Sequence, residues 1–100
     1  MKQRNILLIF ASILLITSCI KDPDHSIRVK NLSDRIVSIT IDDTLIFDSI
    51  AINQKTQYVP INEGTHKIGG DYSGNFVVEG DGTIKWTLEI LNDNFNLVQD

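Results

Sequence analysis

Cysteine is almost absent from this 100-residue sequence, because Cys19 is the only one. Small exported domains often rely on disulfides, but a single cysteine excludes an intrachain disulfide, so packing and hydrogen bonding must stabilise the fold. The sequence also lacks an apolar run of the roughly 20 residues that a membrane-spanning helix needs. Its longest such run, residues 6–16, covers 11 residues. After this run, no segment shows helical periodicity over a useful length.

The apolar run lies between a basic start and the cysteine. Lys2 and Arg4 precede it, and the residues Ile16-Thr17-Ser18-Cys19 close it. A basic start, a short apolar core and small residues before a cleavage point are typical of a secretory signal peptide. The last four residues resemble the lipobox of bacterial lipoproteins, in which an aliphatic residue and two small residues precede an invariant cysteine. The small side chains allow a peptidase close access, and a thiol is the best side-chain nucleophile for taking up a lipid.

The resemblance implies a lipid modification at the cysteine. It implies that the Cys19 sulfur receives a diacylglyceryl group, that cleavage separates Ser18 from Cys19, and that the new amino terminus is acylated, with palmitate as the expected acyl group. One acyl chain anchors a protein only marginally, whereas two or three hold it on a membrane. The alternatives are an ordinary cleaved signal peptide with an unrelated cysteine, or an uncleaved anchor.

Removal of residues 1–18 as the signal peptide leaves 82 residues, which form one domain with a modest core. Because Lys2 and Arg4 are removed with the leader, this part has seven basic against thirteen acidic residues, a net charge of −6 with histidine neutral. An acidic surface repels nucleic acid and anionic headgroups. We therefore expect no nucleic-acid partner, and membrane contact through the lipid on Cys19. The charges are scattered singly, which favours a solvated surface over an acidic docking patch.

Residues 19–25 are expected to form a lipidated tether, because they are polar and show no periodicity. This segment resembles in part the export signal of surface-exposed lipoproteins from Bacteroidetes-type bacteria, which has a lysine and two acidic residues shortly after the lipidated cysteine. Lys21 and Asp22 match, Pro23 interrupts the acidic pair, and Asp24 restores an acid one place late. The resemblance implies display on the surface of the outer membrane. A plain solvated linker is the alternative.

From Ser26 onward, apolar and polar residues mostly alternate, which is typical of half-buried strands. Residues 84–90 keep a strict period of two, so Trp86 is the expected central core aromatic. Gly80-Asp81-Gly82 is the clearest hairpin signal, and Pro60 favours an edge strand or a bulge. We therefore expect an all-β domain over residues 26–100, following an N-terminal signal helix. The expected architecture is a small antiparallel β-sandwich of seven or eight short strands, with a small open barrel as the alternative.

Four turn and strand motifs resemble the small immunoglobulin- or transthyretin-like domains found in such lipoproteins. The motifs are residues 29–33, 42–45, 58–60 and 63–65. Together they span about half of the mature chain, and they are turn and strand signals, not a functional motif. The resemblance therefore implies a sandwich fold and says nothing about activity.

No group of residues is spaced for catalysis or for metal binding. A zinc site needs three or four ligands, and His25 in the tether and His66, expected at the surface or rim, have no free cysteine to join them. Acidic residues such as Asp42 and Asp43 fall in turns, where they are common, and residues 92–96 lack the glycine and glutamate of an EF-hand loop. Neither a Gly-x-Ser-x-Gly motif nor a phosphate-binding glycine loop is present. We expect no enzyme activity, no metal and no cofactor.

The expected function is non-enzymatic binding or surface assembly by a membrane-anchored envelope lipoprotein. Its partner would be a protein or a glycan, bound through an exposed edge strand or through Tyr58 and Tyr72. These two tyrosines are the candidate partner contacts, although aromatic residues at strand spacing also serve as core residues. The alternative is a periplasm-facing assembly factor, inhibitor or immunity-type protein for a single partner.

Overall fold

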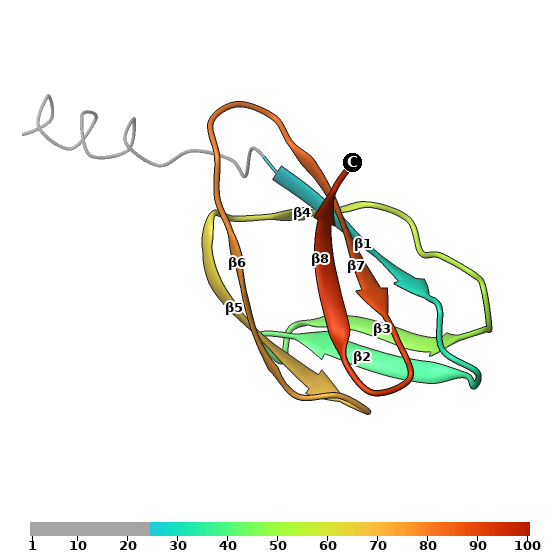
Figure 1. Cartoon of the computed structure of the whole chain (residues 1–100). Helices are drawn as coiled ribbons and strands as arrows, with labels where there is room; N and C mark the ends of the chain where they lie inside the picture. The colour runs from blue at the N-terminus through green and yellow to red at the C-terminus, as the bar shows by residue number, and fades with distance from the viewer. Residues whose placement is uncertain (1–24) are drawn as a thin grey trace, which may run out of the picture.

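A computed structural model describes residues 25–100, and this part of the chain forms eight strands (Figure 1). The strands are β1 (His25–Asn31), β2 (Val37–Ile41), β3 (Leu45–Ile50), β4 (Val59–Ile61), β5 (Gly64–Gly70), β6 (Gly74–Val78), β7 (Lys85–Ile90) and β8 (Phe95–Gln99). They form two four-stranded sheets, sheet A in the order β4-β1-β7-β8 and sheet B in the order β3-β2-β5-β6. The predicted all-β fold is confirmed. No helix among the described residues is long and apolar enough to cross a membrane.

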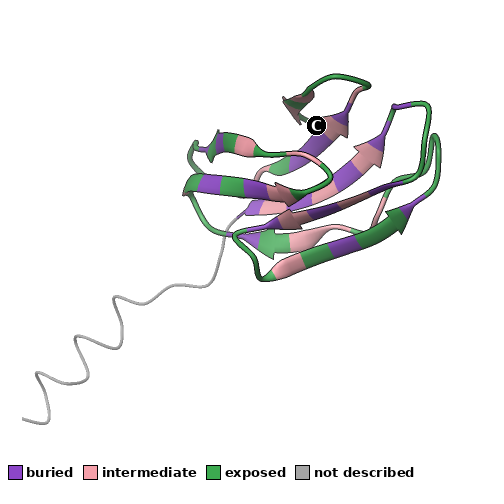
Figure 2. Ribbon diagram, turned by 90° about the horizontal axis from the view of Figure 1, so that it is seen from below, coloured by how far each residue is buried: buried purple, intermediate pink, exposed green. Residues whose placement is uncertain are grey.

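The two sheets enclose one apolar core, to which nearly every strand contributes alternate residues (Figure 2). In β1 and β2, buried and half-buried residues alternate strictly, because successive side chains of a strand point to opposite faces. Trp86, only 9% exposed, belongs to this core, as predicted. It lies near the start of β7, where its ring is 6.5 Å from that of His25. His25 is itself buried and begins β1, so the first strand starts one residue earlier than predicted.

The prediction of a wholly antiparallel sandwich is wrong at one strand pair. β1 and β7 run parallel, with Ser26 opposite Lys85 and Asn31 opposite Ile90, whereas the other strand pairs are antiparallel. Alternation along a strand shows which residues face the core but not the direction of the strand beside it. Because β1 and β7 start at the same end and β8 runs back, Asp100 lies at the His25 end of sheet A (Figure 1).

The hairpin predicted at Gly80-Asp81-Gly82 is also wrong. These residues belong to the connection from β6 in sheet B to β7 in sheet A, so they join strands that do not pair. Both glycines have positive φ, of 128° and 81°. Glycine adopts positive φ without steric cost, so the backbone of this connection explains the two glycines and no hairpin is needed. By contrast, Pro60 lies in β4, an edge strand of sheet A, as predicted.

The glycine-rich segment after His66 closes a hairpin between β5 and β6. Gly70 has φ 87°, and a Cβ placed on it would lie 2.5 Å from the carbonyl oxygen of Ser38 on β2. Glycine is therefore required where β5 crosses close to the backbone of its neighbour. The turn itself comprises residues 71–73, which places Tyr72 next to the connection between β7 and β8.

Candidate functional site

Two surfaces of the sandwich gather polar, charged and aromatic side chains. The first is a cleft of about 610 Å³ at the end of β1 away from His25. Three connections form it, those between β1 and β2, between β5 and β6, and between β7 and β8. Its lining residues are Arg35, Ile36, Asp71, Tyr72, Asn92 and Asp93.

Hydrogen bonds hold the walls of this cleft in place. The Tyr72 hydroxyl donates to the carbonyl oxygen of Leu91 at 2.5 Å. The Asn92 side-chain oxygen accepts from the backbone N–H of Asp34 at 2.9 Å, and Asp71 accepts from the N–H of Ser38 at 2.8 Å. These contacts tie the three connections together. Hydrogen bonds therefore fix the shape of the cleft. It is open to solvent and is lined by basic and acidic side chains and one aromatic ring.

The second surface is the outer face of sheet A. Since alternate residues of β1 are buried, Ser26, Arg28 and Lys30 point outward, and Arg28 lies opposite Thr87 in the register of β7. Lys85 lies opposite Ser26, and Lys55 pairs with Lys30 through an isolated antiparallel bridge. Cross-strand partners share a face of a sheet. The outer face of sheet A thus gathers Arg28, Lys30, Lys55 and Lys85, which we call the cationic face.

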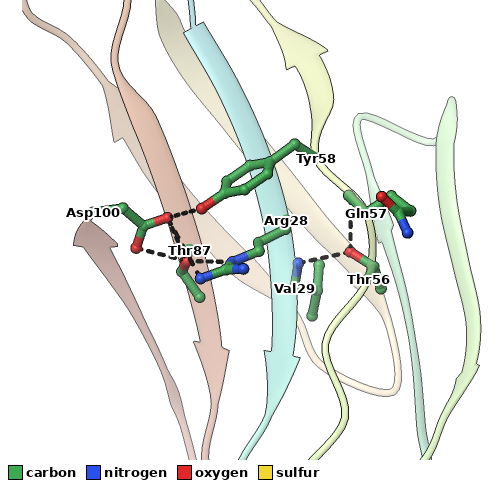
Figure 3. Close-up of polar contacts among 7 residues, drawn as sticks. All are labelled: Arg28, Val29, Thr56, Gln57, Tyr58, Thr87 and Asp100. Carbon is green, nitrogen blue, oxygen red and sulfur yellow. Dashed lines mark hydrogen bonds and ion pairs between the residues drawn. The ribbon is translucent and has the colours of Figure 1, made fainter.

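Tyr58 crosses this face from the segment before β4 (Figure 3). The segment is fixed at Thr56, whose backbone N–H donates to the carbonyl oxygen of Val29 at 2.9 Å. The Arg28 guanidinium carbon lies 4.7 Å from the centre of the Tyr58 ring, and the Lys85 ammonium nitrogen lies 5.0 Å from it. Both distances are within the range of a cation–π interaction. Two cations therefore contact the same ring on the outer face of sheet A.

Asp100 ends the polar cluster around this ring. Its carboxylate accepts hydrogen bonds from the Tyr58 hydroxyl and from Thr87, which lies 2.8 Å from each carboxylate oxygen. Thr87 in turn accepts from Arg28 Nε at 3.0 Å. Burial tends to raise the pKa of Asp100, but the hydrogen bonds from Tyr58 and Thr87 and the charges of Arg28 and Lys55 bring the pKa below its usual value. The hydrogen bond to Asp100 raises the pKa of Tyr58, so its hydroxyl stays protonated.

The two tyrosines predicted as partner contacts do not form one surface. Tyr58 lies at the His25 end of sheet A and Tyr72 lies at the opposite end, in the wall of the cleft. Both rings are half-buried, and both hydroxyl groups already donate to oxygens of the chain. Cys19 and Ser18, the predicted lipidation and cleavage residues, lie outside the described residues.

His66 is buried, and the prediction that it lies at the surface or rim is wrong. It is 8% exposed, its Nδ1 lies 2.5 Å from an Asp42 carboxylate oxygen, and its Nε2 donates to the carbonyl oxygen of Asn62 at 2.7 Å. The ring of Phe76 stacks on it at 5.5 Å. Strand alternation would have placed His66 with Ile68 on the inner face. Pairing with Asp42 depends on sheet B bringing β5 beside β2, which the sequence does not show.

The Asp42–His66 pair has no third metal-ligating side chain beside it among residues 25–100. Within residues 25–100, no group of three or more His, Cys, Asp or Glu side chains is placed to hold a metal ion. No protein-family model matches this chain, and a comparison with curated proteins finds no match either. Residues 25–100 form a two-sheet β-sandwich domain, and the cleft and the cationic face are its candidate functional surfaces.

Proposed function

We propose that this protein is a lipid-anchored lipoprotein of the bacterial outer membrane, whose β-sandwich binds a protein or glycan partner and performs no chemistry. The observation that carries the binding role is the cleft at the end of sheet A away from His25. Its volume of about 610 Å³ falls within the range of roughly 300–1,000 Å³ typical of ligand sites. Ile36, which is 62% exposed, adds an apolar side chain to the lining of this cleft.

The short tether between Cys19 and His25 supports a cleft that lies away from the membrane. His25 lies six positions after Cys19, and a fully extended chain covers at most about 3.6 Å per residue, so His25 stays within about 22 Å of the lipidated residue. The cleft lies at the other end of β1. A lipid on Cys19 would therefore hold the His25 end near the membrane and leave the cleft available to a partner.

The two polar clusters of residues 25–100 support binding over catalysis. On the cationic face, the raised pKa of Tyr58 and the lowered pKa of Asp100 keep a neutral hydroxyl beside a carboxylate at neutral pH. Neither group is poised to exchange a proton near pH 7, as a general acid or base would be. The Asp42–His66 pair has no serine, threonine or cysteine hydrogen-bonded to it among the described residues.

The anchor is tested by labelling cells with a fatty acid. The wild-type protein should incorporate the label and fractionate with membranes, whereas Cys19→Ala should do neither. Ser12→Ala, in the apolar core and outside the lipobox, is the matched control and should behave as the wild type. A labelled Cys19→Ala protein would exclude lipidation at this cysteine.

The partner surface is tested with two exposed isoleucines. Ile36→Asp changes the cleft, while Ile46→Asp changes the outer face of sheet B, where Ile46 is 71% exposed. In cross-linking from detergent-solubilised cells, Ile36→Asp should lose the partner that Ile46→Asp retains. Equal retention by both variants would exclude the cleft as the contact surface.

The second candidate function is a periplasm-facing assembly factor, inhibitor or immunity-type protein for one partner. The same cleft serves this function, so only the side of the membrane separates the two. Protease added to intact cells should digest the domain if it is displayed on the surface. Protection until the outer membrane is opened would favour the internal factor.

A further inference from the structure

Basic and acidic residues are scattered along the sequence, but the fold gathers most of the basic residues on one face. Residues 25–100 contain six basic and eleven acidic residues. Four of the six basic residues form the cationic face, where the acidic residues are Glu89, opposite Lys30 in the register, and Asp100. This face therefore has a net charge of +2, and the rest of the described domain, with two basic and nine acidic residues, has −7.

Most of the positive charge on this face is available to a partner. Among the described residues, Asp100 is paired with Arg28, their nearest charged atoms being 3.9 Å apart. No carboxylate of residues 25–100 forms an ion pair with Lys30, Lys55 or Lys85. Lys55 and Lys85 are exposed, and Lys30 is half-buried along the sheet. None of these three ammonium groups is paired with a carboxylate among the described residues, and that of Lys85 lies over the Tyr58 ring.

The position of this face along the chain suggests its partner. Arg28 lies three residues after His25, and Lys85 lies opposite Ser26. The cationic face therefore begins at the end of sheet A to which the tether is attached. The tether allows His25 no more than about 22 Å from Cys19. A membrane that holds Cys19 is therefore the nearest extended anionic surface to these lysines.

The acidic remainder of the domain does not prevent this contact. Stacked sheets lie about 10 Å apart, which equals or exceeds the Debye length of about 8 Å at physiological ionic strength. Charges on the far face of sheet B are largely screened from a surface that touches sheet A. The net charge of the whole domain is thus a poor guide to what its cationic face binds.

We propose that the cationic face lies against the phosphate-bearing headgroups of the membrane that anchors Cys19, so that the sandwich rests on sheet A with its cleft and sheet B free. This inference rests on the proposed lipid anchor. Each basic residue near an anionic membrane surface contributes about 1 kcal/mol, or about fivefold in affinity. That is too little to bind the membrane alone, but enough to orient a domain that a lipid already holds there.

The test measures lysine reactivity in the full, lipidated chain. The protein is placed in phosphatidylcholine vesicles with or without phosphatidylglycerol and treated with a water-soluble acetylating reagent, and each lysine is quantified by mass spectrometry. Lys67, exposed on β5 of sheet B, is the internal reference. We expect phosphatidylglycerol to slow acetylation of Lys30, Lys55 and Lys85 about fivefold relative to Lys67. Raising the salt to about 1 M, where the Debye length is about 3 Å, should abolish this protection.

A charge variant and a polyanion complete the test. Lys55→Gln combined with Lys85→Gln should remove the protection of Lys30, while Arg35→Gln, which removes a basic residue outside the cationic face, should leave it unchanged. If phosphatidylglycerol leaves the acetylation rates of Lys30, Lys55 and Lys85 unchanged relative to Lys67, the proposal is overturned. Stronger protection by soluble polygalacturonate, added to phosphatidylcholine vesicles, would also overturn it and would assign the face to an acidic polysaccharide.

The mass of the Cys19 peptide separates this proposal from the one on which it rests. If Cys19 carries no lipid, the proposed anchor fails and this inference fails with it. If Cys19 carries lipid and the lysines stay reactive, the anchor stands and only the docking of the cationic face is excluded.

Discussion

Asn31 is a buried polar residue that connects the two sheets. It ends β1 in sheet A, and its side-chain amide donates to the carbonyl oxygens of Arg35 at 2.7 Å and of Ile50, in sheet B, at 2.9 Å. Its side-chain oxygen accepts from the N–H and the hydroxyl of Ser33. A fully buried amide with all its polar atoms satisfied fixes the geometry around it, because any displacement leaves several groups unpaired.

Replacement of Asn31 should destabilise the domain strongly. Asn31→Ala removes the hydrogen bonds to the carbonyl oxygens of Arg35 and Ile50 and to the N–H of Ser33, and we expect a loss of about 2–4 kcal/mol in the free energy of unfolding. Urea unfolding followed by circular dichroism measures this loss. Asn75→Ala, at an exposed position of β6, is the control and should change stability by no more than about 0.5 kcal/mol. Similar values for the two variants would show that the Asn31 network does not stabilise the fold.

Trp86 combines a large core contact with an unpaired donor. Its Nε1 is buried and has no hydrogen-bond partner among residues 25–100. Trp86→Ala should cost about 3–5 kcal/mol, as large aromatic-to-alanine changes in a core do. Trp86→Phe keeps an aromatic ring and removes the unpaired donor, so we expect a clearly smaller loss. Thermal unfolding measured by circular dichroism compares the two variants, and equal losses would contradict the assignment of Trp86 to the core.

At the scale of elements, Asp42 connects the turn between β2 and β3 to strand β5. One carboxylate oxygen lies beside His66, and the other accepts from the backbone N–H of Lys67 at 2.8 Å. Burial tends to raise the pKa of Asp42, but the hydrogen bonds from His66 and Lys67 and the charge of His66 lower it overall from its usual value of 3.8. Asp43, in the same turn, has a similar positive φ and forms none of these bonds.

The lowered pKa of Asp42 predicts the direction of a pH effect. The stabilisation is fully present above the usual value of 3.8 and is lost as the pH falls through the lower pKa of the folded state. Asp42→Asn should therefore be less stable than the wild type at pH 7, and the difference should shrink on acidification. Denaturant unfolding at several pH values measures this. Asp43→Asn, which also tolerates positive φ, should follow the wild type; a pH-independent deficit in Asp42→Asn would contradict the mechanism.

For the whole molecule, the parallel pairing of β1 with β7 determines how the chain unfolds. Sheet A joins the beginning of the described chain to its end, and sheet B is formed by segments between them. Neither sheet is a continuous stretch of sequence, and the core contains side chains from both. The sandwich should therefore unfold as one unit, and it should fold slowly, because three of its six strand pairs, β1–β4, β1–β7 and β2–β5, close long loops.

A chain that starts at Lys21 should show this behaviour in solution. We expect it to be folded and β-rich, with urea transitions that coincide when followed by Trp86 fluorescence and by far-ultraviolet circular dichroism. Trp86 is the only tryptophan, so its emission reports on sheet A directly. Two separated transitions would show that the sheets unfold independently.

The sequence by itself determined most of the strands and the inward faces of three of them. Period-two alternation identified the inward residues of β1, β2 and β7, including Trp86, and Pro60 indicated an edge strand. These properties are local, since the identity of each residue and its neighbours decides whether a strand buries one face. The lipobox at Cys19 is local in the same sense, because it is a contiguous motif, and it remains a prediction.

Only the tertiary structure decided which strands lie side by side, and three features of this domain that differ from expectation follow from that pairing. The glycine-rich segment around Asp81 joins two sheets because β7 pairs with β1 and not with β6. His66 meets Asp42 because β5 pairs with β2, and the lysines of three separate segments share one face because β1 lies between β7 and the segment before β4. Pairing partners are set by how the whole chain best buries its apolar faces, a global property that no single segment contains.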